Sequence, residues 1–89
     1  MQDRYLEITF RKGKPLAGYL YLAREVGARS LRSEATGKGL VVDLGPEGRP
    51  IGIEITAPSR ITLADINELL QKYGLPPLSI EELAPLQAA

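Results

Sequence analysis

Two short segments of alternating hydrophobicity, joined by six residues that include prolines and glycines, restrict the folds open to this chain more than any other feature. The segments are Leu40–Leu44 and Ile51–Ile55, and Gly45–Pro50 lies between them. Prolines and glycines at such a connection favour a turn, so the pattern predicts an antiparallel β-hairpin. One face of the hairpin would carry six aliphatic side chains, those of Leu40, Val42, Leu44, Ile51, Ile53 and Ile55. Such a face requires a covering layer of apolar residues.

A second hairpin is predicted nearer the N-terminus. Tyr5–Phe10 alternates between polar and apolar residues, Arg11–Pro15 has the composition of a turn, and Leu16–Leu22 alternates again. A weaker pattern at Arg29–Glu34 predicts a short edge strand within a loop. Together these segments predict four or five antiparallel strands, arranged as a meander of hairpins over residues of about 4–57.

A helix is predicted after the sheet, at about residues 63–73. Thr62 and Asp65 have the spacing of an N-terminal capping box, in which each side chain accepts a hydrogen bond from the other residue's backbone N–H. Apolar residues then recur at helical spacing as far as Tyr73. Gly74 is expected to end the helix in the left-handed conformation that glycine favours.

A short helical turn is predicted near the C-terminus, at about residues 80–84. Ser79 and Glu82 again have capping-box spacing, and Pro85 is expected to end the turn. The 89 residues are enough for one hydrophobic core. The chain therefore predicts a single α+β domain over residues 1–89, a small antiparallel sheet with a C-terminal helix packed on one face.

The predicted core lies between this helix and the inward face of the sheet. The sheet is expected to contribute Leu6, Ile8, Phe10, Leu20, Leu22, Val42, Ile53 and Ile55, and the helix Leu63, Ile66, Leu70 and Tyr73. The opposite face of the sheet is expected to stay partly open.

Composition excludes much chemistry. The chain contains no cysteine and no histidine, so it lacks thiol nucleophiles and the commonest general base and metal ligand. We expect no catalytic residues, no metal site and no cofactor, and hence no enzymatic activity. No apolar stretch approaches the roughly 20 residues of a membrane span, and the N-terminus lacks the apolar run of a signal peptide. The expected location is the cytoplasm, without a membrane partner.

The charge is balanced overall but polarised along the chain. Eleven basic residues match eleven acidic residues, which argues against non-specific binding to a polyanion. Residues 1–38 carry eight basic and four acidic side chains, whereas residues 39–89 carry three and seven. This distribution fits a fold in which the halves neutralise one another, or a partner of complementary charge.

Two acidic residues form a candidate ligand or cation site on the outward face of the clearest hairpin. Asp43 is expected opposite Gly52, with Glu54 as a diagonal neighbour. Two carboxylates could share a hard cation, and Gly52 would let a ligand approach the backbone. The alternative is an ordinary solvated face.

Tyrosines form a candidate interface on the same face. Tyr19 and Tyr21 share a face opposite Leu20 and Leu22. Tyr5 is expected beside them across the first hairpin, and Val41 is also expected to point outward. Such residues could anchor a second subunit or another protein, and association would add the burial that a small core lacks. Tyrosine also suits half-exposed strands for packing reasons alone.

A third candidate is a basic patch in the least regular segment. Arg24, Arg29, Arg32 and Lys38 could contact phosphates or an acidic partner. Glu25 and Glu34 dilute this charge, and a soluble, charged edge strand is the alternative.

The run from Asp43 to Ile55 resembles the signature of a family of short, mostly prokaryotic proteins known only as a domain of unknown function. The common pattern is D-x-x-x-x-G-x-x-x-G-I-E-I, in which Gly48 and Gly52 supply the glycines here. Leu20-Tyr21-Leu22 is similar to an earlier strand of that family. The chain departs from the pattern at Gly18, where family members usually carry an aspartate.

This resemblance implies a small β-rich fold with a helix, and some family members look like partners encoded beside small toxin-like proteins. The expected function is therefore a non-catalytic protein-binding or regulatory module, antitoxin-like in type and self-associating as a dimer. The alternatives are a nucleic-acid binder that uses the segment from Arg24 to Lys38, and a small-ligand or cation site at Asp43 and Glu54.

Overall fold

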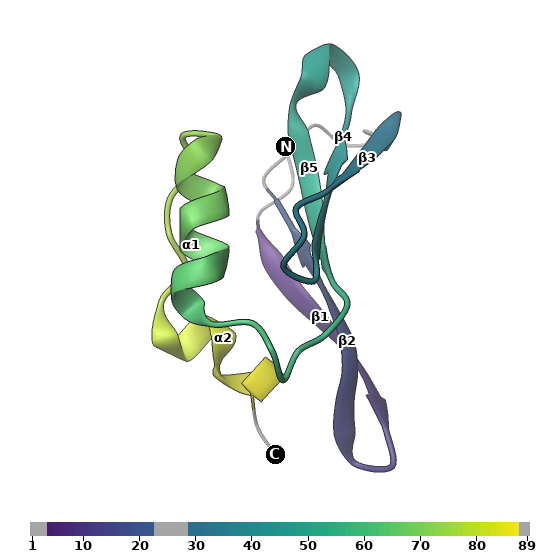
Figure 1. Ribbon diagram of the computed structural model, residues 1–89, viewed down its shortest axis with the longest axis vertical. Coiled ribbons are helices and arrows are strands. Elements are labelled where there is room, and N and C mark those ends of the chain that lie inside the picture. The colour runs from purple at the N-terminus through teal and green to yellow at the C-terminus, as the bar shows by residue number, and fades with distance from the viewer. Residues whose placement is uncertain (1–3, 23–28, 88–89) are drawn as a thin grey trace.

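The computed structural model describes residues 4–22 and 29–87 of the chain, which form five strands and two α-helices. The strands are β1 (Tyr5–Arg11), β2 (Lys14–Tyr21), β3 (Arg32–Ala35), β4 (Leu40–Leu44) and β5 (Pro50–Ile55), and the helices are α1 (Leu63–Lys72) and α2 (Ile80–Gln87). The α+β class with an antiparallel sheet and a C-terminal helix is confirmed. Both helices lie on the same side of the sheet (Figure 1).

The order of the strands across the sheet is β1-β2-β5-β4-β3, and every neighbouring pair is antiparallel. The two predicted hairpins are present, but they do not form one continuous meander, because β5 and not β3 lies beside β2. The burial of β5 and β3 agrees with this order. Five of the six residues of β5 are buried or half-buried, whereas all four residues of β3 are exposed. The apolar strand therefore takes the centre of the sheet and the polar strand takes an edge.

Residues with positive backbone φ angles form the turns of both hairpins. Lys12 and Gly13, with φ of 53° and 79°, connect β1 to β2 in a two-residue turn whose twist matches that of the strands. Glu47 and Gly48, with φ of 63° and 72°, turn the chain between β4 and β5. A register shift at the end of β4 pairs Leu44 with Pro50.

The helix α1 begins and ends as predicted. Thr62 and Asp65 form the capping box, with 3.1 Å between each backbone N–H and its side-chain acceptor. At the other end Gly74 has a φ of 69°, and the N–H of Leu75 donates to the carbonyl of Leu70 at 2.9 Å. This is a Schellman closure, which satisfies carbonyls of the last turn.

Removal of the cap in a Thr62→Ala variant is expected to lower the free energy of unfolding by about 1 kcal/mol, because the N–H of Asp65 loses its acceptor. Urea denaturation followed by circular dichroism measures this change. Thr9→Ala, an exposed threonine in β1, is the matched control and is expected to have a smaller effect. An equal loss in both variants would contradict a capping role for Thr62.

The helix α2 is longer than the turn predicted at 80–84, and Pro85 lies within it. Proline removes one backbone hydrogen bond from a helix, but the buried side chains of Leu83 and Leu86 anchor α2 on both sides of Pro85. Packing thus prevails over the local preference of proline.

The start of α2 is held by a capping box and by the N-terminal segment. The backbone N–H of Ser79 donates to the Glu82 carboxylate at 3.0 Å, and the backbone N–H of Glu82 donates to the Ser79 hydroxyl at 3.1 Å. The backbone N–H of Ser79, together with the nearby Arg4 guanidinium, lowers the pKa of Glu82. Arg4 also donates to the carbonyls of Pro76 and Pro77 at 2.6 and 3.2 Å.

The core lies between the helices and the inward sheet face. It contains Leu20, Leu22, Leu40, Val42, Leu44, Ile53, Ile55, Ile61, Ile66, Leu69, Leu70, Leu78, Leu83 and Leu86, with Leu6, Ile8, Leu63, Tyr73 and Leu75 partly buried against it. Phe10 was predicted in this core, and that prediction is wrong, since its side chain is 54% exposed. The pairing shifts between Thr9 and Phe10, and the end of the β1–β2 hairpin runs past the helices (Figure 1).

Candidate functional site

The sheet face opposite the helices carries no covering layer in the described part of the chain (Figure 1). Strand register places ten residues on this open face, in two rows across all five strands. The first row is Tyr5, Tyr21, Gly52, Asp43 and Ser33, and the second is Glu7, Tyr19, Glu54, Val41 and Ala35. The open face therefore combines the tyrosine and acidic candidates of the sequence in one surface.

Three tyrosines form a ladder on the open face. The rings of Tyr5 and Tyr21 stack with centroids 4.5 Å apart and an interplanar angle of 15°, and Tyr19 is tilted against Tyr21 at 4.7 Å. The expectation that Tyr5 lies beside the other two is confirmed. Ring faces that pack on each other do not form a flat platform for nucleic-acid bases. Aromatic area on rigid strands is instead characteristic of protein interfaces.

Asp43 is the polar centre of the open face. Its carboxylate accepts hydrogen bonds from the hydroxyls of Tyr19 and Ser33, each at 2.5 Å, one on each oxygen. Asp43 pairs with Gly52 in the register, as predicted. The ring of Tyr19 fills the space over Gly52, so that a Cβ atom there would overlap it. The opening predicted for a ligand at Gly52 is therefore occupied by a side chain of the protein itself.

Ser33 was not identified as a site residue from the sequence. Its contact with Asp43 depends on the pairing of Ser33 with Asp43 between β3 and β4. Only the register of the edge strand could have indicated this contact, and the hydrophobic pattern of β3 is too weak to define a register.

The second acidic candidate, Glu54, is exposed and lies between Tyr19 and Val41 in the register. Among residues 4–22 and 29–87, no group of three or more potential metal-ligating side chains of Asp, Glu, His or Cys is found. In the same residues, no polar or charged side chain is buried. The arrangement on the open face thus offers contact area and negative charge rather than a desolvated acid or base.

The members of the predicted basic patch are dispersed. Arg24 lies outside the described residues, and Arg29 is exposed. Arg32 lies 3.8 Å from Glu34, and Lys38 lies 3.9 Å from Asp65 and 3.7 Å from a second carboxylate of α1. Two of the three described cations are therefore close to carboxylates, which reduces the local positive potential.

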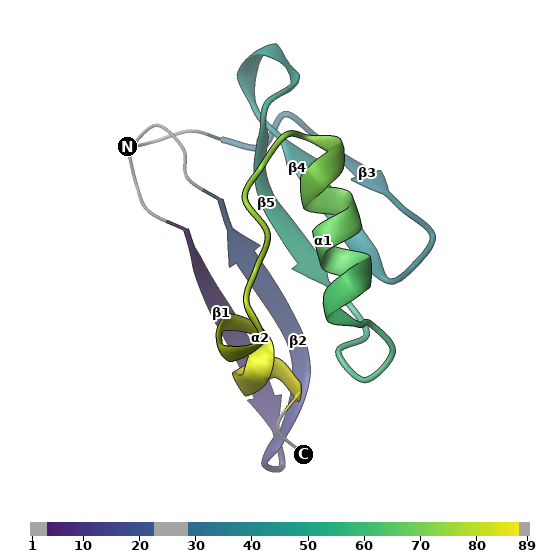
Figure 2. The same cartoon turned by 90° about the vertical axis from the view of Figure 1, so that its left-hand side faces the viewer.

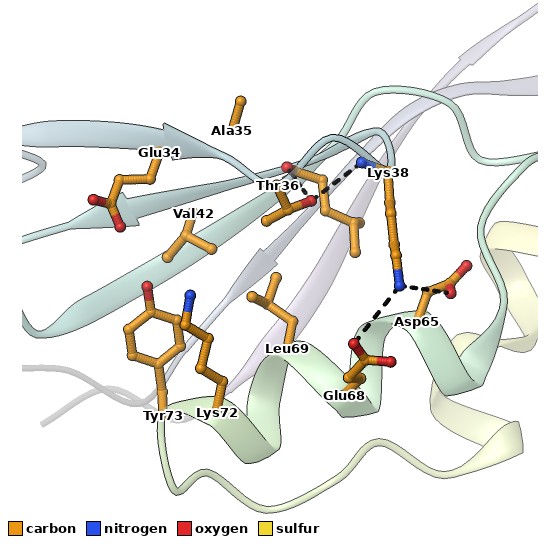
Figure 3. A pocket seen from close by; sticks show the side chains of 11 residues that line it. Glu34, Ala35, Thr36, Lys38, Val42, Asp65, Glu68, Leu69, Lys72 and Tyr73 are labelled. Carbon is orange, nitrogen blue, oxygen red and sulfur yellow. Dashed lines mark hydrogen bonds and ion pairs between the residues drawn. The ribbon is translucent and has the colours of Figure 1, made fainter.

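A groove of about 860 Å³ lies between β3 and α1 (Figure 3). Lys38 reaches from the loop after β3 to Asp65 and Glu68 on the helix and crosses one end of the groove. Leu69 of α1 and Tyr73, which directly follows the helix, point into the groove (Figure 3). The lining thus mixes apolar groups with charges of both signs, without a buried reactive group.

In the described residues, no helix is both long and apolar enough to cross a membrane. Comparison of the chain with known proteins gives no match to a family model, to a curated protein or to a solved structure.

Proposed function

We propose that this protein is a non-catalytic, protein-binding module of regulatory type, and that the open sheet face is its contact surface. The tyrosine ladder carries this proposal. Tyr5 is 50% exposed, and it is stacked on Tyr21, whose hydroxyl donates to Glu7 at 3.4 Å. Rings that are held in place before binding lose little side-chain entropy in a complex, which favours affinity.

The charge of the open face supports a basic partner. The ten positions in its two rows include three carboxylates, Glu7, Asp43 and Glu54, and no cation. Complementary charge accelerates association and selects among partners. A small basic protein in the cytoplasm, regulated in the manner of a toxin by an antitoxin, is the partner we propose.

The same face is less suited to a second copy of this chain. The two rows of the face carry Glu7, Asp43 and Glu54 and no cation, so a second copy of the face offers these carboxylates no opposite charge. Like-charge repulsion therefore destabilises the dimer that was expected through Tyr19, Tyr21 and Val41.

Affinity capture from the host's own extract tests the proposal. The tagged protein is expected to retain a basic protein at low and moderate salt, and Tyr5→Lys is expected to release it, because the variant places a cation on the contact surface. Ile80→Lys is the control, since Ile80 is 72% exposed on α2, away from the open face.

Equal retention by Tyr5→Lys and Ile80→Lys would exclude the open face as the contact surface. Retention of nucleic acid that is lost as salt rises would support the basic-patch alternative instead. A thermal shift with Ca²⁺, Mg²⁺ or Mn²⁺ that disappears in Asp43→Asn would support the cation alternative.

A further inference from the structure

Among residues 4–22 and 29–87, the edge strand β3 has backbone groups that no second strand pairs with. Figure 2 shows β3 at one margin of the sheet, where β4 is its only neighbouring strand among the described residues. The N–H of Thr36 donates to the carbonyl of Leu40 at 3.0 Å. Hydrogen-bonded residues alternate along an antiparallel strand, so the backbone of Glu34 faces β4, and the N–H and C=O groups of Ser33 and Ala35 face away from it.

The side chains of β3 are self-complementary about Ser33. Arg32 and Glu34 flank Ser33, and both point to the helix side of the sheet, as do their partners Leu44 and Val42 in β4. Their own contact, at 3.8 Å, joins two exposed side chains. In an antiparallel pairing centred on Ser33, each Arg32 would lie opposite a Glu34 of the other copy.

We propose that β3 pairs antiparallel with β3 of a second copy of this chain, centred on Ser33, to give a dimer with one continuous ten-stranded sheet. In this register the outward N–H and C=O of Ser33 bond to those of Ser33 of the second copy. Arg32 and Glu34 then occupy the narrow pairs, in which side chains lie closest together. The two attractive cross-strand pairs stabilise this dimer.

Other registers are disfavoured by charge. A shift of two residues in one direction sets Glu34 opposite itself, and a shift in the other direction sets Arg32 opposite itself. A shift of one residue sets residues whose backbone groups face the second copy opposite residues whose backbone groups face β4. The hydrogen bonds between the two copies are then lost. Like charges directly opposite each other are destabilising, so the charges select one register and one occupant, a second copy of the chain.

This interface leaves the proposed contact surface free. A two-fold axis perpendicular to the sheet keeps both pairs of helices on one side and both tyrosine ladders on the other. The dimer would then present two copies of the open face side by side, and it would border the groove between β3 and α1 with a second strand (Figure 3).

Analytical ultracentrifugation of charge variants tests the dimer. A short interface predicts weak association, so the wild-type protein is measured up to about 0.5 mM at low salt. Arg32→Glu and Glu34→Arg each replace two attractive pairs by two repulsive ones, and each is expected to weaken self-association at least about tenfold. An equal mixture of the two variants is expected to form a heterodimer. In that heterodimer the introduced glutamate of one variant faces the introduced arginine of the other, and the native Glu34 faces the native Arg32.

Three further proteins complete the test. The double variant Arg32→Glu/Glu34→Arg restores both pairs in reversed order and is expected to dimerise as the wild type does. Ser33→Pro removes an outward N–H without breaking a backbone hydrogen bond to β4, although it also removes the hydroxyl that donates to Asp43. The variant is expected to be monomeric, with its fold checked by circular dichroism. Arg60→Glu is the charge-matched control on an exposed turn and is expected to leave dimerisation unchanged.

A monomeric wild type at the highest concentration would overturn the proposal, as would a mixture of the two charge variants that stays monomeric. A dimer lost in Tyr21→Lys but kept in Arg32→Glu would assign self-association to the open face instead. The result is independent of partner capture, because the two tests substitute different residues.

Discussion

Replacement of Leu70 by alanine is expected to lower the free energy of unfolding by about 3 kcal/mol, because the change leaves a cavity between α1 and the sheet. Leu70 is 0% exposed and belongs to the continuous core cluster. Domains of this size have a total stability of roughly 5–15 kcal/mol, so the loss is a large part of the whole. The midpoint of urea denaturation measures it, provided that the dependence of the unfolding free energy on urea is unchanged.

Leu16→Ala is the matched control for this prediction. It removes the same atoms from a side chain that is 51% exposed at the end of the β1–β2 hairpin, so the expected loss is below about 1 kcal/mol. A loss at Leu16 equal to that at Leu70 would mean that the helix does not cover the sheet as described.

The second large effect is expected from Gly52→Ala. A Cβ atom at this position overlaps the ring of Tyr19, so the ring must leave its place and its hydrogen bond to Asp43 breaks. The free energy of unfolding is expected to fall by about 1–3 kcal/mol. Near-ultraviolet circular dichroism is expected to change as well, because Tyr19 packs against Tyr21.

A double-mutant cycle shows whether this effect acts through Tyr19. Gly52→Ala is made in the wild type and in Tyr19→Ala, where no ring lies over the glycine. The cost of Gly52→Ala is expected to be smaller in the second background, and the difference is the coupling free energy of the two positions. Equal costs in both backgrounds would show that the destabilisation by Gly52→Ala does not act through the ring of Tyr19.

Much of the fold could be predicted because local signals and global packing agree. The alternating segments, the turn at Gly45–Pro50 and the capping residues Thr62 and Ser79 each mark an element that the structure contains. The strand order could not be predicted. The pattern of β3 carries few apolar side chains, and nothing local indicates that β2 pairs with β5.

The burial of individual side chains was predictable only where the sheet is regular. Phe10 follows the alternation of β1, but a shift in register and the end of the covering layer leave it exposed. Leu83 and Leu86 are buried although the sequence predicted that the helix ends at Pro85. Their packing overrides the tendency of proline to end a helix.

The candidate site was predictable in its register but not in its side-chain positions. The alternation placed Asp43 opposite Gly52 and Tyr5 near Tyr21. The lean of Tyr19 over Gly52 depends on a rotamer choice, and the contact of Ser33 with Asp43 depends on an edge strand, so neither follows from hydrophobic periodicity.

The hydrogen bonds from Arg4 to the carbonyls of Pro76 and Pro77 join residues that are 72 and 73 positions apart in the sequence. Pro76 and Pro77 precede α2, which packs against the hairpin of β1 and β2. Leu86 of that helix lies directly over Gly18. During synthesis on the ribosome, the first hairpin is complete long before its apolar face can be covered by α2. The order of translation therefore sets a folding order, in which the N-terminal hairpin stays partly uncovered until the last helix has emerged.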